Sequence, residues 1–225
     1  MSITVLSTKI LTTSQKAILT KANIKVEAYD AINIEYLTPD IDPAFKNIIF
    51  TSQNSVKAFL NIVGPQNLKN NIFAAFCVGE KTKSVLEKNG INVMETTHYG
   101  AELAKILINK YSNEPFLFLC GDKRRHEIPS YLTRHEVVFK EQTVYKNTPN
   151  PLTFTPDFNG ILFFSPSGIE SFVAKNNLKN SMAFCIGTTT AAEAEKYTKN
   201  ITIAQKPTIE SLLERVLESY KTKNN

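Results

Sequence analysis

Short apolar runs alternate along the chain with longer amphipathic stretches. Most runs end in a corner rich in Ser, Thr or Gly and are followed by apolar residues at helical spacing. In the stretch 81–90, Thr82, Val85, Leu86 and Asn89 fall at i, i+3, i+4 and i+7 before a helix-ending Gly90. This alternation predicts an α/β fold with parallel sheets flanked by helices. The predicted strands are 3–8, 24–30, 47–52, 73–79, 115–121, 137–145, 160–165, 181–187 and 200–204. The predicted helices include 15–23, 81–90, 102–112, 189–200 and 209–220.

One pattern occurs twice in the chain. "FTSQNSVKAF" (50–59) and "FFSPSGIESF" (163–172) each join an apolar run to a short helix through a hydroxyl-bearing corner. The likeness continues from "FCVGEKTKSVLEKNGINV" to "FCIGTTTAAEAEKYTKNITI". The repeat predicts two similar domains built from a duplicated α/β unit.

A second near-repeat predicts the domain boundaries. "INIEYLTPD" (32–40) and "TVYKNTPN" (143–150) both alternate in polarity and end in Thr-Pro, where a proline that cannot donate to a ladder stops the strand. If segments 32–37 and 143–150 pair as a two-stranded β-ladder connector, the chain crosses between the domains twice. Domain 1 then combines 1–31 with 151–225, and domain 2 is 38–142. Two unrelated loops are the alternative.

Charge and composition narrow the ligand class. The net charge of +5 and pI near 9.0 favour an anionic ligand or nucleic acid. The tight basic cluster, "KRRH" (123–126), is interpreted as a solvated helix start, because no nucleic-acid recognition motif accompanies it. We therefore expect no nucleic-acid partner.

The expected compartment is the cytoplasm. No apolar stretch reaches the roughly 18 residues of a membrane span, and the first residues lack a signal-peptide pattern. Cys77, Cys120 and Cys185 lack zinc-ligand spacing and are predicted to be buried strand-end residues. No long apolar surface helix stands out, which favours a monomer.

Hydroxyl and glycine corners are the candidate binding positions. They follow strands at the carboxyl edge of each sheet, where helix N-termini present free N–H groups to anions. Helix capping explains any one of these residues, but four such corners together predict an anion-holding cleft between the domains. The corner residues are Thr51, Ser52, Ser55, Gly79, Thr82 and Gly121 in domain 2, and Ser165, Ser167, Gly168, Gly187, Thr188, Thr189 and Thr190 in domain 1.

Several familiar sites are missing from the sequence. There is no GxGxxG, no GxxxxGK[ST] and no GxSxG motif, and His98, His126 and His135 lack zinc-ligand spacing. Any chemistry must therefore rely on binding, positioning and weak acids.

The ordered motifs together resemble the uroporphyrinogen-III synthase family. They cover nearly the whole chain: "IIFTSQNSVKAF", "CVGEKTKSVLEKNGI", "FLCGDKRRHEIPSYL", "VYKNTP", "ILFFSPSGIESF", "CIGTTTAAEA" and "KPTIESLLERV". The resemblance implies two α/β domains joined by a two-stranded ladder. It also implies hydroxymethylbilane, a linear tetrapyrrole with eight carboxylates, as the substrate, and no metal or organic cofactor. The implied reaction is dehydration and cyclisation through a spiro intermediate, with inversion of ring D.

The resemblance also implies roles for particular residues. Tyr145 in "VYKNT" is expected to assist departure of the hydroxyl group, by hydrogen bonding because a phenol has a pKa near 10. A tyrosine that only packs the connector is the alternative. The positions expected to bind carboxylates are Thr51, Ser52 and Thr82, and Ser165, Ser167, Gly168, Thr189 and Thr190.

Two departures from the family pattern weaken the assignment of Lys9 and Thr188 to substrate binding. Lys9 in "LSTKIL" stands where an Arg is common and lacks its bidentate fork, and Thr188 stands where a Pro is frequent. Two other functions stay open: a two-lobed protein that binds an anionic small molecule, and a family member that has lost catalysis.

Overall fold

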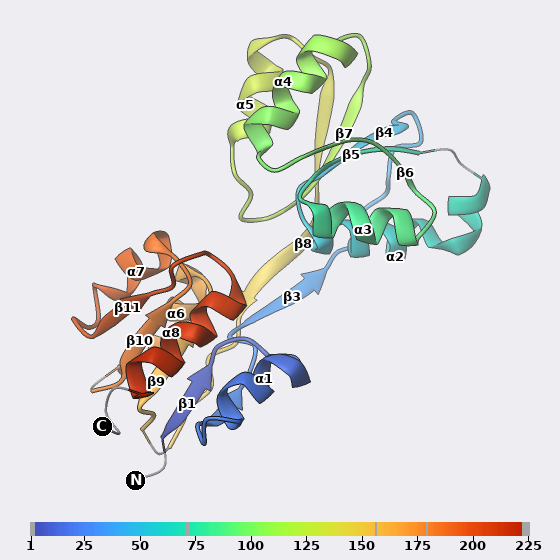
Figure 1. Ribbon diagram of the computed structural model, residues 1–225. Helices are drawn as coiled ribbons and strands as arrows, with labels where there is room; N and C mark the ends of the chain where they lie inside the picture. The colour runs from blue at the N-terminus through green and yellow to red at the C-terminus, as the bar shows by residue number, and fades with distance from the viewer. Residues whose placement is uncertain (1–2, 71–72, 156, 179, 222–225) are drawn as a thin grey trace. The chain divides into compact units, whose positions relative to one another are not determined.

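The structure is a computed structural model that describes residues 3–70, 73–155, 157–178 and 180–221. The chain divides into two compact units, each an α/β unit (Figure 1). Unit 1 is Met1–Asn33 with Thr148–Asn225, and unit 2 is Ile34–Asn147. The chain passes between the units at 33–34 and at 147–148, inside the two Thr-Pro segments.

Unit 1 is built on a parallel sheet of five strands in the order β11-β10-β9-β1-β2. Residues of β9 and β1 pair in register, with Ile161 beside Leu6. The elements are β1 (Thr4–Ser7), α1 (Thr13–Thr20), β2 (Lys25–Ala28), β9 (Gly160–Phe163), α6 (Pro166–Val173), β10 (Met182–Cys185), α7 (Thr188–Ala194), β11 (Ile201–Ile203) and α8 (Ile209–Lys221).

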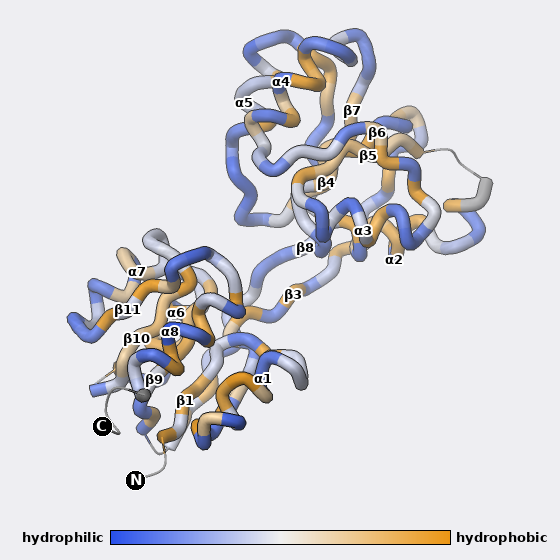
Figure 2. The backbone as a smooth tube through the Cα atoms, in the orientation of Figure 1, coloured by the Kyte–Doolittle hydropathy of each residue, from blue (hydrophilic) through white to orange (hydrophobic). Residues whose placement is uncertain are grey.

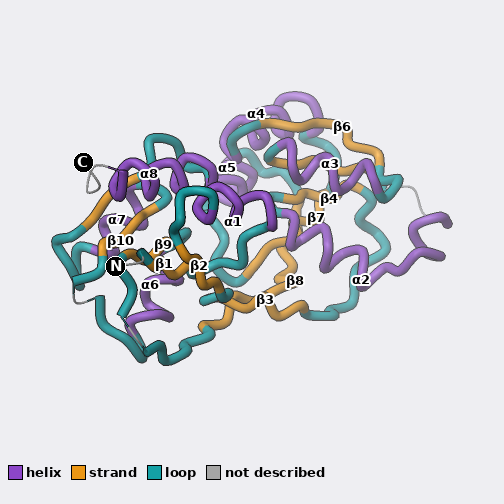
Figure 3. Tube along the Cα trace, turned by 60° about the horizontal axis from the view of Figure 1, so that its bottom comes forward, coloured by secondary structure: helices purple, strands orange, loops and turns teal. Residues whose placement is uncertain are grey.

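Helices cover both faces of this sheet because successive strand residues point to opposite sides. Leu6 and Phe163 pack with Phe172 of α6 and with α7, whereas Val5 and Leu162 pack with Leu213 of α8 and with α1. Figure 3 shows α6 on one side of β1 and β9, with α1 and α8 on the other. Strands β9 and β10, which are covered on both faces, are hydrophobic along their length (Figure 2).

Unit 2 is built on a six-stranded sheet in the order β3-β8-β7-β4-β5-β6. Strands β4 to β8 pair in parallel with one another, and β3 lies beside β8, where the Leu37 amide donates to the Val144 carbonyl. The elements are β3 (Ile32–Tyr36), β4 (Asn47–Phe50), α2 (Gln53–Asn70, broken at Gly64 before Pro65), β5 (Ala74–Val78), α3 (Glu80–Lys88), β6 (Asn92–Thr97), α4 (Gly100–Tyr111), β7 (Phe116–Gly121), α5 (Glu127–Arg134) and β8 (Phe139–Pro149).

The two faces of this sheet are also covered by different helices. Phe50 and Leu119 pack against α2 and α3, whereas Ile49 and Phe118 pack against α4 and α5. The side of the sheet to which each helix returns is thus set by the alternation of apolar residues along the strands.

The two sheets share one spatial order although their chain orders differ. When the two strand orders are aligned, the strands of the repeated segments coincide: β9 with β4, β10 with β5 and β11 with β6. The remaining strands β1 and β2 then coincide with β7 and β8. The predicted fold class, two similar parallel-sheet domains flanked by helices, is confirmed. Unit 1 takes two of its strands from the N-terminal end of the chain, so the duplicated unit is circularly permuted.

The element boundaries differ from the prediction in two main places. Strand β6 was not predicted, because Asn92–Thr97 is a mostly polar edge strand paired only with β5. The predicted helix 189–200 ends earlier, since α7 stops at Ala194. The three cysteines are free and buried, as predicted. Within the described residues, no helix is long and apolar enough to cross a membrane.

Candidate functional site

In unit 2 the chain reverses its winding between two adjacent central strands. Helix α2 leaves the end of β4 for one face of the sheet, and α5 follows β7 on the other face. Because the two connections diverge, a crevice opens beyond the carboxyl ends of β4 and β7, the position at which open α/β sheets bind ligands.

A cavity of about 300 Å³ occupies this position. Its wall contains the ends of β4 and β7, the segment 98–100 and the basic segment 123–125. Its volume lies at the lower end of the range of small-molecule pockets. The residues that line it include Thr51, Ser52, His98, Tyr99, Gly121, Lys123, Arg124, Arg125, Glu127 and Tyr145.

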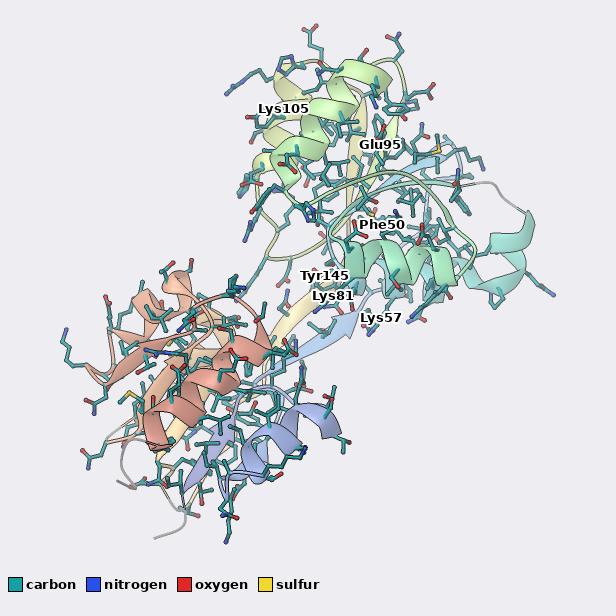
Figure 4. All side chains as sticks on the ribbon, viewed as in Figure 1. Phe50, Lys57, Lys81, Glu95, Lys105 and Tyr145 are labelled. Atoms are coloured by element: carbon teal, nitrogen blue, oxygen red, sulfur yellow. The ribbon has the colours of Figure 1, made fainter. Side chains whose placement is uncertain are left out.

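Tyr145, which extends from β8 (Figure 4), lies directly over Gly121. A Cβ placed on Gly121 would stand 2.5 Å from Cζ of the tyrosine ring and 2.8 Å from its hydroxyl oxygen. No residue with a side chain fits at position 121 while the ring keeps this place. The glycine that ends β7 therefore makes room for the phenol.

The phenol is held by a serine from the neighbouring strand end. The hydroxyl oxygens of Tyr145 and Ser52 lie 3.1 Å apart. Ser52 is held in turn by Ser55, whose backbone N–H donates to Ser52 Oγ at 3.1 Å. Ser55 Oγ donates to the Ser52 carbonyl at 2.8 Å. This hydroxyl corner caps the start of α2 and also fixes a partner for the phenol.

Burial raises the pKa of Tyr145 above its ordinary value of 10.0, although the hydrogen bond with Ser52 lowers it and the charges of Cys120 and Asp122 raise it further. The phenol is therefore protonated at neutral pH, and it can donate a hydrogen bond to a group in the cavity.

Three consecutive basic residues, Lys123, Arg124 and Arg125, line the cavity together with Glu127. Arg124 is occupied, because it forms an ion pair with Glu141 and lies 3.1 Å from His126 Nδ1. Lys123 and Arg125 are exposed, and neither side chain forms an ion pair within the described residues. These two cations are free to bind carboxylates, which Arg can do in bidentate fashion.

The structure also brings together a hydroxyl corner in unit 1. Ser165 caps α6 by accepting from the Gly168 N–H at 3.1 Å, and its Oγ lies 3.2 Å from that of Ser167. A Cβ on Gly168 would lie 3.6 Å from the hydroxyl of Thr8, which follows β1. This corner stands at the equivalent switch point of unit 1, between β9 and β1.

The other glycine corner of unit 1 lies at the end of the neighbouring strand β10. Gly187 precedes α7 in an extended conformation and makes no side-chain cap. Thr188 and Thr189 are exposed, and Thr190 is buried. Thr189 is thus accessible to a ligand, whereas the side chain of Thr190 faces the interior of the unit.

Not every predicted residue of unit 2 reaches the cavity. Thr51, Ser52 and Tyr145 line it, whereas Ser55 and Thr82 are buried behind the surface. Gly79, with φ of +89°, begins α3 at the next strand end in a backbone conformation that favours glycine.

Sequence reasoning missed the basic wall of the cavity. Lys123 and Arg125 were taken as part of a solvated helix start, yet they line the cavity that contains Tyr145. The available signal was their position, directly after the strand-ending Gly121, because ligands of such sheets bind at carboxyl ends of strands. Lys9 is exposed and follows β1 in unit 1. Within the described part of the chain, no group of three or more His, Cys, Asp or Glu side chains could hold a metal ion.

Comparisons with known proteins give the chain a family. Residues 18–214 match the family Uroporphyrinogen-III synthase HemD. A uroporphyrinogen-III synthase of Chlorobaculum parvum is 28% identical over 203 aligned residues, with 76% of this chain and 82% of the relative covered. The porphyrin biosynthesis protein HemD of Ruminiclostridium josui is 24% identical over 191 residues, and the alignment covers 76% of this chain and 37% of that protein.

Solved structures support the fold. The crystal structure of uroporphyrinogen-III synthetase from Helicobacter pylori matches with a TM-score of 0.75 at 24% identity, covering 96% of this chain and 99% of the other. A mutant uroporphyrinogen III synthase from Thermus thermophilus matches with a TM-score of 0.57 at 10% identity, covering 98% and 99%.

Proposed function

The chain belongs to the uroporphyrinogen-III synthase family, and we propose that it converts hydroxymethylbilane to uroporphyrinogen III. The observation that carries this proposal is the protonated phenol of Tyr145, held 3.1 Å from Ser52 in a cavity that two unpaired cations flank. Such a site offers a weak acid beside groups that bind carboxylates, which is what dehydration of a polyanionic alcohol requires.

The proposed first step is departure of the hydroxyl group. The Tyr145 O–H donates a hydrogen bond to the leaving oxygen as the carbon–oxygen bond breaks, and the pyrrole nitrogen supplies the electron pair. The departing oxygen takes up one proton and leaves as water, and the cationic, electrophilic methylene carbon remains attached to the first ring; the proton lost at ring closure restores the balance. Ser52 orients the phenol, because its own hydroxyl is fixed by Ser55.

The electrophilic carbon then attacks the substituted position of the last ring and forms the spiro intermediate. The bond from that position to its original methylene group breaks and leaves that methylene carbon electrophilic. This carbon then bonds to the free α-carbon on the other side of the ring nitrogen, which loses its proton. The product contains the last ring inverted. Linear substrate also closes unaided without inversion, so the protein must chiefly hold the bilane in a bent conformation.

The carboxylates are proposed to be bound at several places in each unit. In unit 2, Lys123 and Arg125 supply charge, and Thr51 and Ser52 supply hydroxyl groups. The corners at Gly79 and, in unit 1, at Ser165, Ser167, Gly168, Gly187 and Thr189 are proposed as further hydrogen-bonding positions. Each neutral hydrogen bond contributes on the order of 1 kcal/mol.

A monomer in the cytoplasm without a nucleic-acid partner is part of the same proposal. Three free, buried cysteines are compatible with a reducing compartment, and no nucleic-acid recognition motif accompanies the basic segment.

Isomer analysis tests the function directly. Purified protein is incubated with freshly made hydroxymethylbilane, and the uroporphyrin isomers are separated after oxidation. We expect predominantly type III, and a large loss of rate for Tyr145→Phe. Type I alone, formed at the spontaneous rate, would contradict the proposal and favour a family member that binds the bilane without catalysis.

A further inference from the structure

Strand β8 is irregular at the residue before Tyr145. Cys120 of β7 pairs with Thr143, but the next residue, Gly121, pairs with Tyr145, so one extra residue of β8 is accommodated at Val144. Such a bulge changes the face to which the following side chains point and often occurs next to active sites. Without it, the side-chain alternation that buries Val144 would carry Tyr145 away from Gly121.

The strand beyond the bulge is held by one carboxylate. Asp122 Oδ1 accepts from the backbone N–H of Asn147 at 3.0 Å and from its side-chain amide at 2.8 Å. The backbone N–H of Asp122 donates to the Tyr145 carbonyl at 3.1 Å. Asp122 therefore contacts β8 on both sides of Lys146, while its neighbour Gly121 contacts the phenol ring.

We propose that Asp122 is a positioning residue, whose carboxylate oxygen holds β8 in its bulged register and thereby aims the phenol of Tyr145 at Ser52. The proposal deepens the proposed function, on which it rests for the catalytic role of the phenol. Asp122 does not line the cavity, so its effect reaches the reaction through Tyr145 and not through the substrate.

Two variants separate the acceptor oxygen from the charge. Asp122→Ala removes the acceptor and leaves the two donors of Asn147 to water. Asp122→Asn keeps a side-chain carbonyl oxygen at the same position without the negative charge. Since the carboxylate is exposed, water replaces part of what is lost, and we expect kcat to fall about tenfold in Asp122→Ala. KM should stay within about twofold, and Asp122→Asn should restore most of kcat.

Asn147→Ala provides an intermediate test. It removes the side-chain donor but keeps the backbone N–H that donates to Asp122. We expect a loss of kcat smaller than that in Asp122→Ala. Glu87→Ala, which removes an exposed ion pair with Lys83 on α3, is the matched control and should leave kcat unchanged.

A spectroscopic measurement makes the result independent of turnover. In protein labelled with 13C at Cζ of tyrosine, the Tyr145 signal is assigned by its loss in Tyr145→Phe. We expect this signal to shift or broaden in Asp122→Ala and to keep its wild-type position in Asp122→Asn and Glu87→Ala. This readout holds even if the wild-type protein yields no type III product, so failure of the function and failure of the positioning role are distinguishable.

Three outcomes would overturn the proposal. An unchanged Tyr145 signal in Asp122→Ala would show that the carboxylate does not place the ring. An equal defect in Asp122→Asn would assign the effect to charge. A rise in KM with unchanged kcat would place Asp122 in substrate binding.

Discussion

Gly121→Ala tests whether the position of the phenol, apart from its presence, determines the rate. The substitution removes no atom of the site and adds one methyl group under the Tyr145 ring. The added Cβ would lie 2.5 Å from Cζ, whereas ordinary contact begins at 3.4 Å, so the ring must move by about 0.9 Å (3.4 − 2.5). The movement falls on the ring because all three close atoms belong to it.

The expected effect is kinetic and not structural. A misplacement of about 1 Å can lower the rate of a positioned reaction about 100-fold, which corresponds to about 2.7 kcal/mol in the barrier. Because the ring lies at the end of its side chain and beside a cavity, we expect overpacking to cost only about 1 kcal/mol of stability. A chain of this size should then lose about 2–4 °C in Tm.

The assay is the initial rate of type III formation from hydroxymethylbilane, with type I measured as the spontaneous background. A double-mutant cycle with Tyr145→Phe is the control, since two changes that act through one phenol are not additive. Gly121→Ala should therefore reduce the rate little further in the Tyr145→Phe background. The reasoning is refuted if Gly121→Ala keeps kcat within about threefold of the wild type, or if the two losses multiply.

Three more predictions concern the cavity of unit 2 and the buried Tyr29 of unit 1. Lys123→Ala with Arg125→Ala should raise KM about tenfold or more and weaken its salt dependence, whereas Lys105→Ala on α4, outside the cavity, should change neither; equal KM values would contradict this role. Because the pKa of Tyr145 is raised, the phenol stays protonated below pH 10, so loss of its proton should not lower kcat below pH 9. A decline of kcat in that range that is present in the wild type and absent from Tyr145→Phe would contradict this. Tyr29→Phe removes a buried hydroxyl that has no hydrogen-bond partner in the described part of the chain. It should raise the free energy of unfolding by up to about 1 kcal/mol in denaturant unfolding, with the rate unchanged; a loss of stability would show that the hydroxyl has a partner.

The order of the elements could be read from the sequence because it depends on local patterns. An apolar run such as "FLFLCG" is buried on both faces, which made β7 predictable. A hydroxyl residue such as Ser165 caps the start of a helix, which made α6 predictable. The edge strand β6 was not, because a strand with one neighbour and a solvated face can be largely polar. Which residues form the site depends on register, and register is a tertiary property.

The residues of the candidate site also divide into those predictable from local sequence and those that depend on tertiary pairing. Ser52 and Tyr145 were proposed from motif position, and the structure places their oxygens 3.1 Å apart. Ser55 was proposed as a residue of the hydroxyl corner but is fully buried. The bulge at Val144 has no signature in the sequence, since it arises from pairing with β7, and the basic residues looked like an ordinary helix start.

Two tyrosines lie at corresponding strand ends of the two sheets but differ in their surroundings. Tyr29 follows β2 beside β1 as Tyr145 lies on β8 beside β7, so the two occupy corresponding places in sheets of the same order. Tyr29 packs against Phe154 with its hydroxyl buried and without a hydrogen-bond partner among the described residues, and burial raises its pKa to about 12. Tyr145 differs in three respects: a glycine beneath the ring, a serine at its oxygen and an adjoining cavity. Since the duplicated fold supplies both tyrosines, the position at the strand end does not by itself determine the surroundings of the phenol. The features that distinguish Tyr145 are the glycine beneath its ring, the serine at its oxygen and the adjoining cavity, into which its side chain is exposed.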